Sequence, residues 1–125
     1  MLKHRFIICL GSNTANSAEL IAGACTEIAA LVTDFIKSDT YSMPSFTGVG
    51  DAYNNCVIAG STDHSFSDFT AYTKQLERNA GRTEQSKEAG IMPLDVDIMI
   101  WDDEVIRPKE IDRPYFDKGF KQISQ

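Results

Sequence analysis

The sequence predicts an α+β fold of the ferredoxin-like type, with the order βαββαβ, an antiparallel sheet and two helices on one face. Short apolar runs typical of strands recur four times, and two stretches of helical periodicity separate them. Glycine, proline and asparagine mark the turns between these segments. A length of 125 residues with 42% hydrophobic and 24% charged residues predicts a single domain over residues 1–125.

The first two elements are a buried strand and a helix. Residues 6–10 form a continuous apolar run, which indicates a central strand, and residues 11–13 turn out of it. Apolar residues then recur on one helical face over residues 17–31. Asn16 is the expected N-cap of this helix, with Glu19 as its capping-box partner.

Two more strands follow, on either side of a long loop. Residues 34–41 alternate imperfectly and predict the second strand, which ends before Pro44 because proline cannot join a central ladder. Residues 42–51 contain one proline and two glycines and predict a loop whose length suggests a functional role. Residues 55–60 are largely apolar and predict the third strand.

The second half of the chain predicts a helix, a loop and the fourth strand. Ser65 is the expected N-cap of a helix that ends at Gly81. Residues 83–92 are polar and show no period, so they predict a second long loop. Residues 94–106 predict the fourth strand and a short hairpin turned by two aspartates, whereas residues 107–125 show no clear element.

Charge and cysteine content exclude several classes of protein. Twelve basic and eighteen acidic residues give a net charge of −6, which argues against a nucleic-acid or anionic-membrane surface. No apolar run approaches the length of a membrane span or of a signal peptide core. Cys9, Cys25 and Cys56 form no metal or disulfide pattern, so we expect buried thiols and a cytoplasmic protein.

The strongest chemical signal is the pair Asp95 and Asp97 on the fourth strand. Residues two apart on a strand point to the same side, so the two carboxylates project together while Leu94, Val96 and Ile98 enter the core. Adjacent carboxylates repel each other, and a divalent cation completed by phosphate oxygens would relieve this. The alternative to a metal site is that the two aspartates belong to a solvated strand face at a sheet edge. The sequence contains no phosphate-binding loop, dinucleotide fingerprint or nucleophile elbow.

Five ordered segments carry the motifs of a known family. The first is residues 6–13, which end in Leu-Gly-Ser-Asn, and the second is residues 38–44, which end in Tyr-Ser-Met-Pro. The other three are Tyr-Asn-Asn-Cys-Val at 53–57, Leu-Glu-Arg-Asn-Ala-Gly-Arg at 76–82 and Pro-Leu-Asp-Val-Asp-Ile-Met at 93–99. Together these segments resemble the 6-hydroxymethyl-7,8-dihydropterin pyrophosphokinase family of folate biosynthesis. The resemblance covers about residues 6–120 and agrees with the predicted fold.

The resemblance implies an activity and its cofactor. Enzymes of this family join a pterin alcohol to the β-phosphorus of ATP and release AMP, so the expected partners are ATP and 6-hydroxymethyl-7,8-dihydropterin. Two Mg²⁺ ions would bind the triphosphate and both Asp95 and Asp97. Arg82, near the phosphates, would join these two aspartates as a catalytic residue. We also expect a homodimer as a possible assembly.

The resemblance also implies two groups of binding residues. The substrate-binding residues would be Pro44, Phe46, Tyr53, Asn55 and Phe120. By this resemblance, Tyr53 and Phe120 would sandwich the flat ring, and the carboxamide of Asn55 would bind its amide edge. The nucleotide-binding residues would be Lys74, Glu77, Arg82 and Ile98. Five of these residues have a structural alternative. Tyr53 could pack at a strand entrance, Asn55 could satisfy backbone groups, and Phe120 could be a loose hydrophobic residue of the tail. Glu77 and Arg82 could be ordinary solvated helix residues.

One segment departs from the family pattern. Within residues 83–92, Glu84, Glu88 and Met92 stand where the family has arginine, and Ala89 stands where it has tryptophan. Glu110 likewise replaces a frequent arginine, and the chain stops soon after residue 120. The cationic half of the nucleotide site is therefore mostly lost, although basic residues elsewhere could replace it, namely Lys74, Lys87, Arg107 and Arg113.

Three functions remain open on this basis. The first is a divergent Mg²⁺-dependent pyrophosphokinase, supported by the retained aspartates Asp95 and Asp97. The second is a non-catalytic pterin- or nucleotide-binding module of the same fold, supported by the acidic segment 83–92. The third is a metal-dependent transferase with another phosphorylated substrate.

Overall fold

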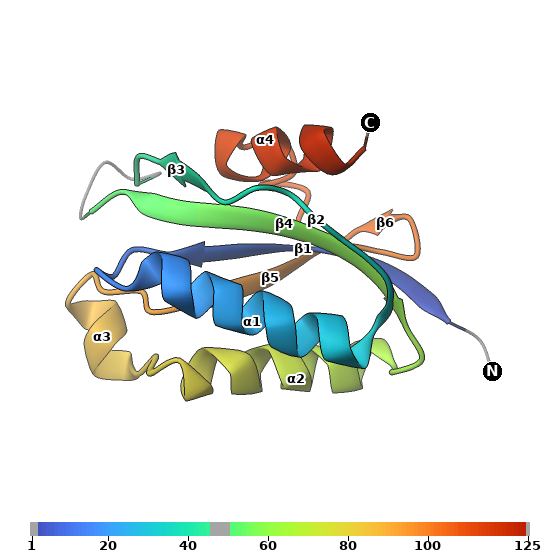
Figure 1. Ribbon diagram of the computed structural model, residues 1–125, viewed down its shortest axis with the longest axis horizontal. Helices are drawn as coiled ribbons and strands as arrows, with labels where there is room; N and C mark the ends of the chain where they lie inside the picture. The colour runs from blue at the N-terminus through green and yellow to red at the C-terminus, as the bar shows by residue number, and fades with distance from the viewer. Residues whose placement is uncertain (1–2, 46–50, 125) are drawn as a thin grey trace.

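The computed structural model describes residues 3–45 and 51–124 and has a six-stranded antiparallel sheet at its centre (Figure 1). The strands are β1 His4–Ser12, β2 Thr33–Lys37, β3 Tyr41–Met43, β4 Tyr53–Thr62, β5 Asp95–Trp101 and β6 Glu104–Val105. The helices are α1 Ser17–Leu31, α2 Phe66–Asn79, α3 Glu84–Glu88 and α4 Pro114–Ile123. The sheet order is β2-β4-β1-β5-β6, and β3 also pairs with β4. This arrangement confirms the predicted antiparallel α+β fold.

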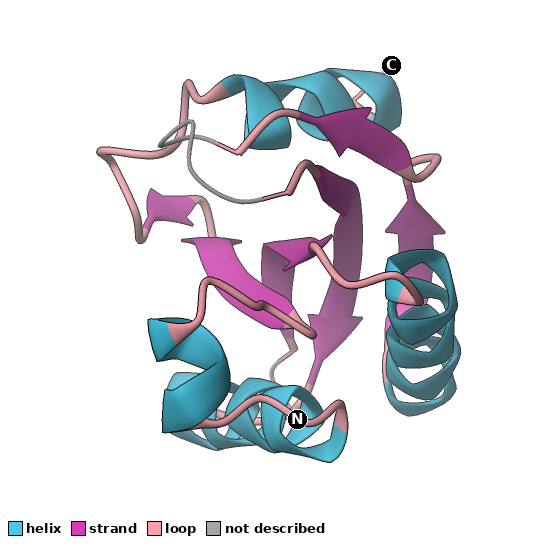
Figure 2. Ribbon diagram, turned by 90° about the vertical axis from the view of Figure 1, so that its left-hand side faces the viewer, coloured by secondary structure: helices cyan, strands magenta, loops and turns pink. Residues whose placement is uncertain are grey.

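Helices cover both faces of the sheet. Helices α1 and α2 lie on one face, as predicted, and α4 lies across the strands on the other (Figures 1 and 2). The side chains of β1 alternate between the two sides. Phe6, Ile8 and Leu10 join the larger core under α1 and α2, whereas Ile7 and Cys9 join a smaller core under α4. The central strand is therefore apolar on both faces.

The two long helices match their predicted positions, but only one of the two predicted caps is present. The Ser65 hydroxyl accepts a hydrogen bond from the Asp68 amide at 3.1 Å, which caps α2. Asn16 makes no side-chain capping bond at α1. Its Oδ1 accepts a hydrogen bond from the Thr14 hydroxyl at 2.8 Å, so the turn before the helix uses the oxygen that a cap would need.

Two segments differ from their predicted form because local hydrogen bonds override the pattern. The predicted strand 34–41 divides into β2 and β3, since the Ser38 hydroxyl accepts from the Val57 amide at 2.9 Å between them. The predicted loop 83–92 contains α3, which a capping box of Thr83 and Ser86 starts. The three cysteines are buried, as predicted.

The reading of residues 107–125 as lacking a clear element was wrong, because this segment contains α4. Pro114 stands in the first turn of α4, where a missing amide costs nothing. Phe116, Phe120 and Ile123 form an apolar stripe that packs on the sheet, and Gly119 lies within it. A glycine inside a segment makes a helix harder to predict from the sequence. Here Gly119 allows α4 to pack closely against β4. Within the described residues, no helix has the length and apolar character required to span a membrane.

Candidate functional site

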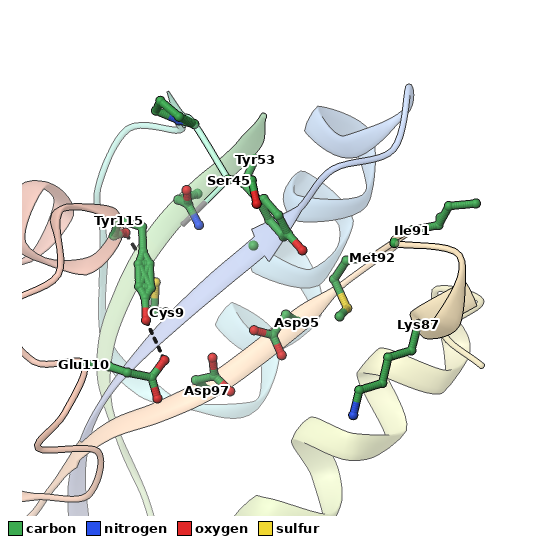
Figure 3. A pocket seen from close by; sticks show the side chains of 14 residues that line it. Cys9, Ser45, Tyr53, Lys87, Ile91, Met92, Asp95, Asp97, Glu110 and Tyr115 are labelled. Atoms are coloured by element: carbon green, nitrogen blue, oxygen red, sulfur yellow. Dashed lines mark hydrogen bonds between the residues drawn. The ribbon is translucent and has the colours of Figure 1, made fainter. Parts of the chain in front are cut away.

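The candidate site is a cavity of about 330 Å³ on the α4 side of the sheet, at the end of β1 (Figure 3). Strands β1, β4 and β5 form its floor, and the segments after β3, α3 and β6 form its walls. Its lining residues are Cys9, Gly11, Pro44, Ser45, Tyr53, Asn55, Lys87, Gly90, Ile91, Met92, Asp95, Asp97, Glu110 and Tyr115.

The register of three strands brings the predicted residues together. Gly11 on the central strand pairs with Asn55 on one side and with Asp95 on the other. Two residues earlier, Cys9 pairs with Asp97, so the same face of the sheet carries both carboxylates. A Cβ atom at Gly11 would lie 3.0 Å from Nδ2 of Asn55 and 3.4 Å from Cδ2 of Tyr53. The glycine therefore leaves room for both side chains on the cavity floor.

The two aspartates face the cavity, and the residues between and beside them enter the core. Leu94, Val96 and Ile98 are buried under α1 and α2, which confirms the predicted alternation. Burial, followed by the neighbouring Asp95 carboxylate, raises the pKa of Asp97 to about 8. These side chains thus resist holding two negative charges on this strand.

An ion-pair network centred on the buried Glu77 fixes Asp95 from the side of α2. Nη1 of Arg82 lies 2.8 Å from Oε2 of Glu77 and 3.0 Å from Oδ1 of Asp95. Glu77 is nearly inaccessible and also accepts a hydrogen bond from the Val96 amide at 2.9 Å. Lys74 lies 3.4 Å from the other oxygen of Glu77. This network connects the end of α2 to β5 and orients Asp95.

A second network surrounds Asp97 on the side of α4. Nη1 of Arg107 lies 3.5 Å from Oδ1 of Asp97, and its Nε donates to Glu110. The Tyr115 hydroxyl donates to the other oxygen of Glu110, as Figure 3 shows. Burial and this bond raise the pKa of Tyr115. Each aspartate therefore has its own arginine.

Asn13 attaches the wall segment after α3 to the end of β1. Its Nδ2 donates to the Gly90 carbonyl at 2.9 Å, and its Oδ1 accepts from the Met92 amide at 2.6 Å. These bonds hold Gly90, Ile91 and Met92 at the cavity. The turn after the first strand thus helps to form the wall of the cavity.

Asn55 offers the cavity a buried oxygen that has no hydrogen-bond partner in the part of the chain that the structure describes. The residue is 4% exposed, and its Nδ2 donates to the Leu10 carbonyl at 3.3 Å. Its Oδ1 is buried and accepts no hydrogen bond in the described structure. A buried acceptor without a partner costs free energy, so this atom is a candidate for ligand contact. Burial also raises the pKa of the adjacent Tyr53.

The structure assembles some of the predicted site residues and separates others. Pro44, Tyr53, Asn55, Asp95 and Asp97 line the cavity, whereas Arg82, Glu77 and Lys74 form the network beside it. Ile98 lies in the larger core, away from the cavity lining. Phe120 stacks on Phe116 in the smaller core, with ring centroids 5.1 Å apart, and also does not reach the lining. Phe46 lies outside the described residues.

Several lining residues were not predicted as site residues. Cys9 carried a usable signal, because it precedes Gly11 by two residues on one strand and so shares its face. Burial raises the pKa of its thiol, which keeps it protonated. Glu110 and Tyr115 lie in the segment that the sequence left without an element, and only the position of α4 brings them to the cavity.

The carboxylate pair fits Mg²⁺ bound together with a phosphate ligand. Among the described residues, no group of three or more His, Cys, Asp and Glu side chains is placed to hold a metal ion. Mg²⁺ is commonly bound by one or two carboxylates, with phosphate oxygens and water completing its shell. Asp95 and Asp97 match this requirement, and the raised pKa of Asp97 indicates a place where positive charge is favourable.

Comparisons with known proteins agree with this geometry. The sequence is 29% identical over 84 residues to the folic acid synthesis protein FOL1 of Dictyostelium discoideum. That alignment covers 65% of the chain and 13% of FOL1, so the chain spans a small part of this relative. Residues 7–125 match the 7,8-dihydro-6-hydroxymethylpterin-pyrophosphokinase family. The chain therefore belongs to the family of 7,8-dihydro-6-hydroxymethylpterin-pyrophosphokinases.

Proposed function

We propose that the chain transfers the pyrophosphoryl group of ATP to 6-hydroxymethyl-7,8-dihydropterin in a Mg²⁺-dependent reaction that releases AMP. One observation carries the proposal: a single cavity holds both an amide oxygen that has no partner among the described residues and a pair of carboxylates. Oδ1 of Asn55 suits the N–H edge of a flat heterocycle, and Asp95 with Asp97 suits a metal–phosphate group. Family membership supports both assignments.

The pterin half of the site is the side lined by Tyr53 and Asn55. The Tyr53 ring would stack on the pterin, and Oδ1 of Asn55 would accept a hydrogen bond from a ring N–H. The cavity volume of about 330 Å³ suits a small ligand. Phe120 lies in the core, so Tyr115, which lines the same cavity, is a better candidate for the second aromatic contact.

The reacting half of the site is the side lined by the aspartates. Mg²⁺ held by Asp95 and Asp97 would neutralise phosphate charge and lower the barrier to transfer. In the reaction, the hydroxymethyl oxygen forms a bond to the β-phosphorus and loses its proton. The bond from the β-phosphorus to the oxygen shared with the α-phosphorus breaks, and that oxygen leaves with AMP. Arg82 and Glu77 would keep Asp95 in place throughout.

A non-catalytic binding module is the second candidate, and one observation favours it. Among the described residues that line the cavity, Lys87 is the sole lysine or arginine. Each aspartate already has an arginine partner, which offsets part of its negative charge without a metal ion. Such a module would bind the pterin and leave ATP untouched.

AMP formation from Mg-ATP and 6-hydroxymethyl-7,8-dihydropterin separates the two candidates. The enzyme should form AMP only when the pterin is present, and Asp97→Asn should abolish this while remaining folded. Asp103→Asn is the matched control, because Asp103 is exposed in the β5–β6 turn, where asparagine tolerates its φ of 69°. Pterin binding without AMP formation by wild-type protein would overturn the proposed reaction and support the binding module.

A further inference from the structure

Of the two arginines that pair with Asp95 and Asp97, Arg107 is better placed to move. It follows β6, and its guanidinium lies between two cavity-lining carboxylates, those of Asp97 and Glu110. Its side chain is 43% exposed, compared with 22% for Arg82. Arg82 is also held by Glu77, which is 4% exposed. Separating Arg107 from partially exposed partners should cost much less than extracting Arg82 from its buried pair.

The charges at the cavity show why a movable cation is needed. Asp95, Asp97 and Glu110 line the site with carboxylates, and Lys87 is the basic residue that the described lining contributes. A nucleotide triphosphate carries several negative charges and needs cationic partners beyond a metal ion. The Arg107 guanidinium could supply one, since its planar fork of N–H donors matches phosphate oxygens.

Arg107 and a divalent cation would compete for the same carboxylate. Nη1 of Arg107 lies 3.5 Å from Oδ1 of Asp97. A metal ion on Asp97 would remove much of the attraction that holds the guanidinium there, because two neighbouring cations repel. The released guanidinium would lie at the wall of the cavity, beside the metal-bound phosphates.

We propose that Arg107 is a phosphate-binding residue that pairs with Asp97 and Glu110 in the ligand-free protein and exchanges them for nucleotide phosphate oxygens when a divalent cation occupies Asp97. This assignment rests on the proposed function, since it requires Mg-ATP at the site. It explains how a chain with glutamate in the segment 83–92 retains a cation for the triphosphate.

The exchange predicts opposite effects of Arg107→Ala on two ligands. Mn²⁺ alone, titrated by electron paramagnetic resonance, should bind more tightly by up to about fivefold, because the partly exposed guanidinium of Arg107 no longer competes for Asp97. The α,β-methylene analogue of ATP with Mg²⁺, titrated by calorimetry, should bind about 10- to 100-fold more weakly, the range for a lost charged hydrogen bond. Arg107→Lys should fall between the alanine variant and wild type, since lysine retains the charge without the fork.

Arg5→Ala is the matched control, because it removes one arginine at the opposite end of β1 from Gly11. It should change neither affinity. Equal weakening of both ligands by Arg107→Ala, or an unchanged nucleotide affinity, would overturn the assignment. Failure of wild-type protein to bind the nucleotide analogue would overturn the proposed function as well. Circular dichroism confirms in each case that the variant is folded.

Discussion

Replacing Gly119 with alanine should destabilise the protein, although alanine favours a helix by about 1 kcal/mol over glycine. A Cβ atom at Gly119 would lie 2.6 Å from Cγ2 and 2.9 Å from Cβ of Val57, and 2.7 Å from the Tyr41 hydroxyl. The Val57 Cβ atom belongs to β4 and cannot rotate away, so α4 itself must shift. Inserting a methyl group into a packed core costs about 1–3 kcal/mol.

The same shift should disturb the cavity. The Tyr41 hydroxyl donates to the Tyr115 carbonyl at 2.6 Å and accepts from the Gly119 amide at 3.2 Å. An added methyl group therefore enters the contact that fixes Tyr115 on α4. We expect Gly119→Ala to weaken pterin binding as well as to lower stability.

Gly23→Ala is the matched substitution with the opposite expected sign. Gly23 lies on an exposed face of α1, and a Cβ atom there would meet nothing within 4 Å. Alanine should stabilise by about 0.5–1 kcal/mol at this position. Gly119→Ala should cost a net ~0–2 kcal/mol once the gain in helix propensity is subtracted from the packing cost, and the 2.6 Å approach to Cγ2 of Val57 favours the upper end of this range.

Thermal unfolding followed by circular dichroism measures both effects. For a chain of this length, each 1 kcal/mol corresponds to about 3–6 °C in Tm. The midpoint should therefore rise for Gly23→Ala and fall for Gly119→Ala. An alanine at 119 that stabilises the protein to the same extent as one at 23 would refute the close packing of α4 on β4.

Three further predictions concern the site. The native pKa of Asp97 exceeds its unfolded value, so the native state holds the extra proton and stability falls as pH rises from about 4 to 8. Asp97→Asn should flatten this slope in urea unfolding with EDTA, and an unchanged slope would contradict it. Gly11→Ala should weaken pterin binding in calorimetry by crowding Asn55, with little loss of fold. Glu77→Gln should reduce AMP formation and stability together, because Arg82 then loses its buried partner, whereas unchanged turnover would exclude a positioning role.

Hydrophobic periodicity predicted the main strands and helices, because it shows which faces of each element are buried. The continuous apolar run 6–10 required a strand covered on both sides, and β1 extends this run from His4 to Ser12. The stripe over 17–31 required a helix on one face of the sheet, and α1 has these bounds. The short elements escaped the pattern, since α3 depends on a capping box and β3 on the register of three residues with β4.

The candidate site likewise has features that the sequence predicted and features that depend on tertiary packing. Asp95 and Asp97 could be placed on one side of a strand from their spacing alone, and the motifs that contain Tyr53 and Asn55 were recognisable in the sequence. Their convergence follows from the pairing of β1 with both β4 and β5, which the linear sequence does not state. The position of Phe120 could not be predicted from its motif, because the orientation of α4 places its side chain in the smaller core.

The sequence by itself determined the family, the order of the main strands and helices, and the two carboxylates, because local periodicity and short motifs encode these properties. The tertiary structure decided which cations accompany the carboxylates. Arg82 and Arg107 lie 13 and 10 residues from Asp95 and Asp97 along the chain, yet ion pairs bring them to these side chains. Such pairs depend on how α2 and the segment after β6 pack against the sheet, and no spacing rule along the chain fixes that packing.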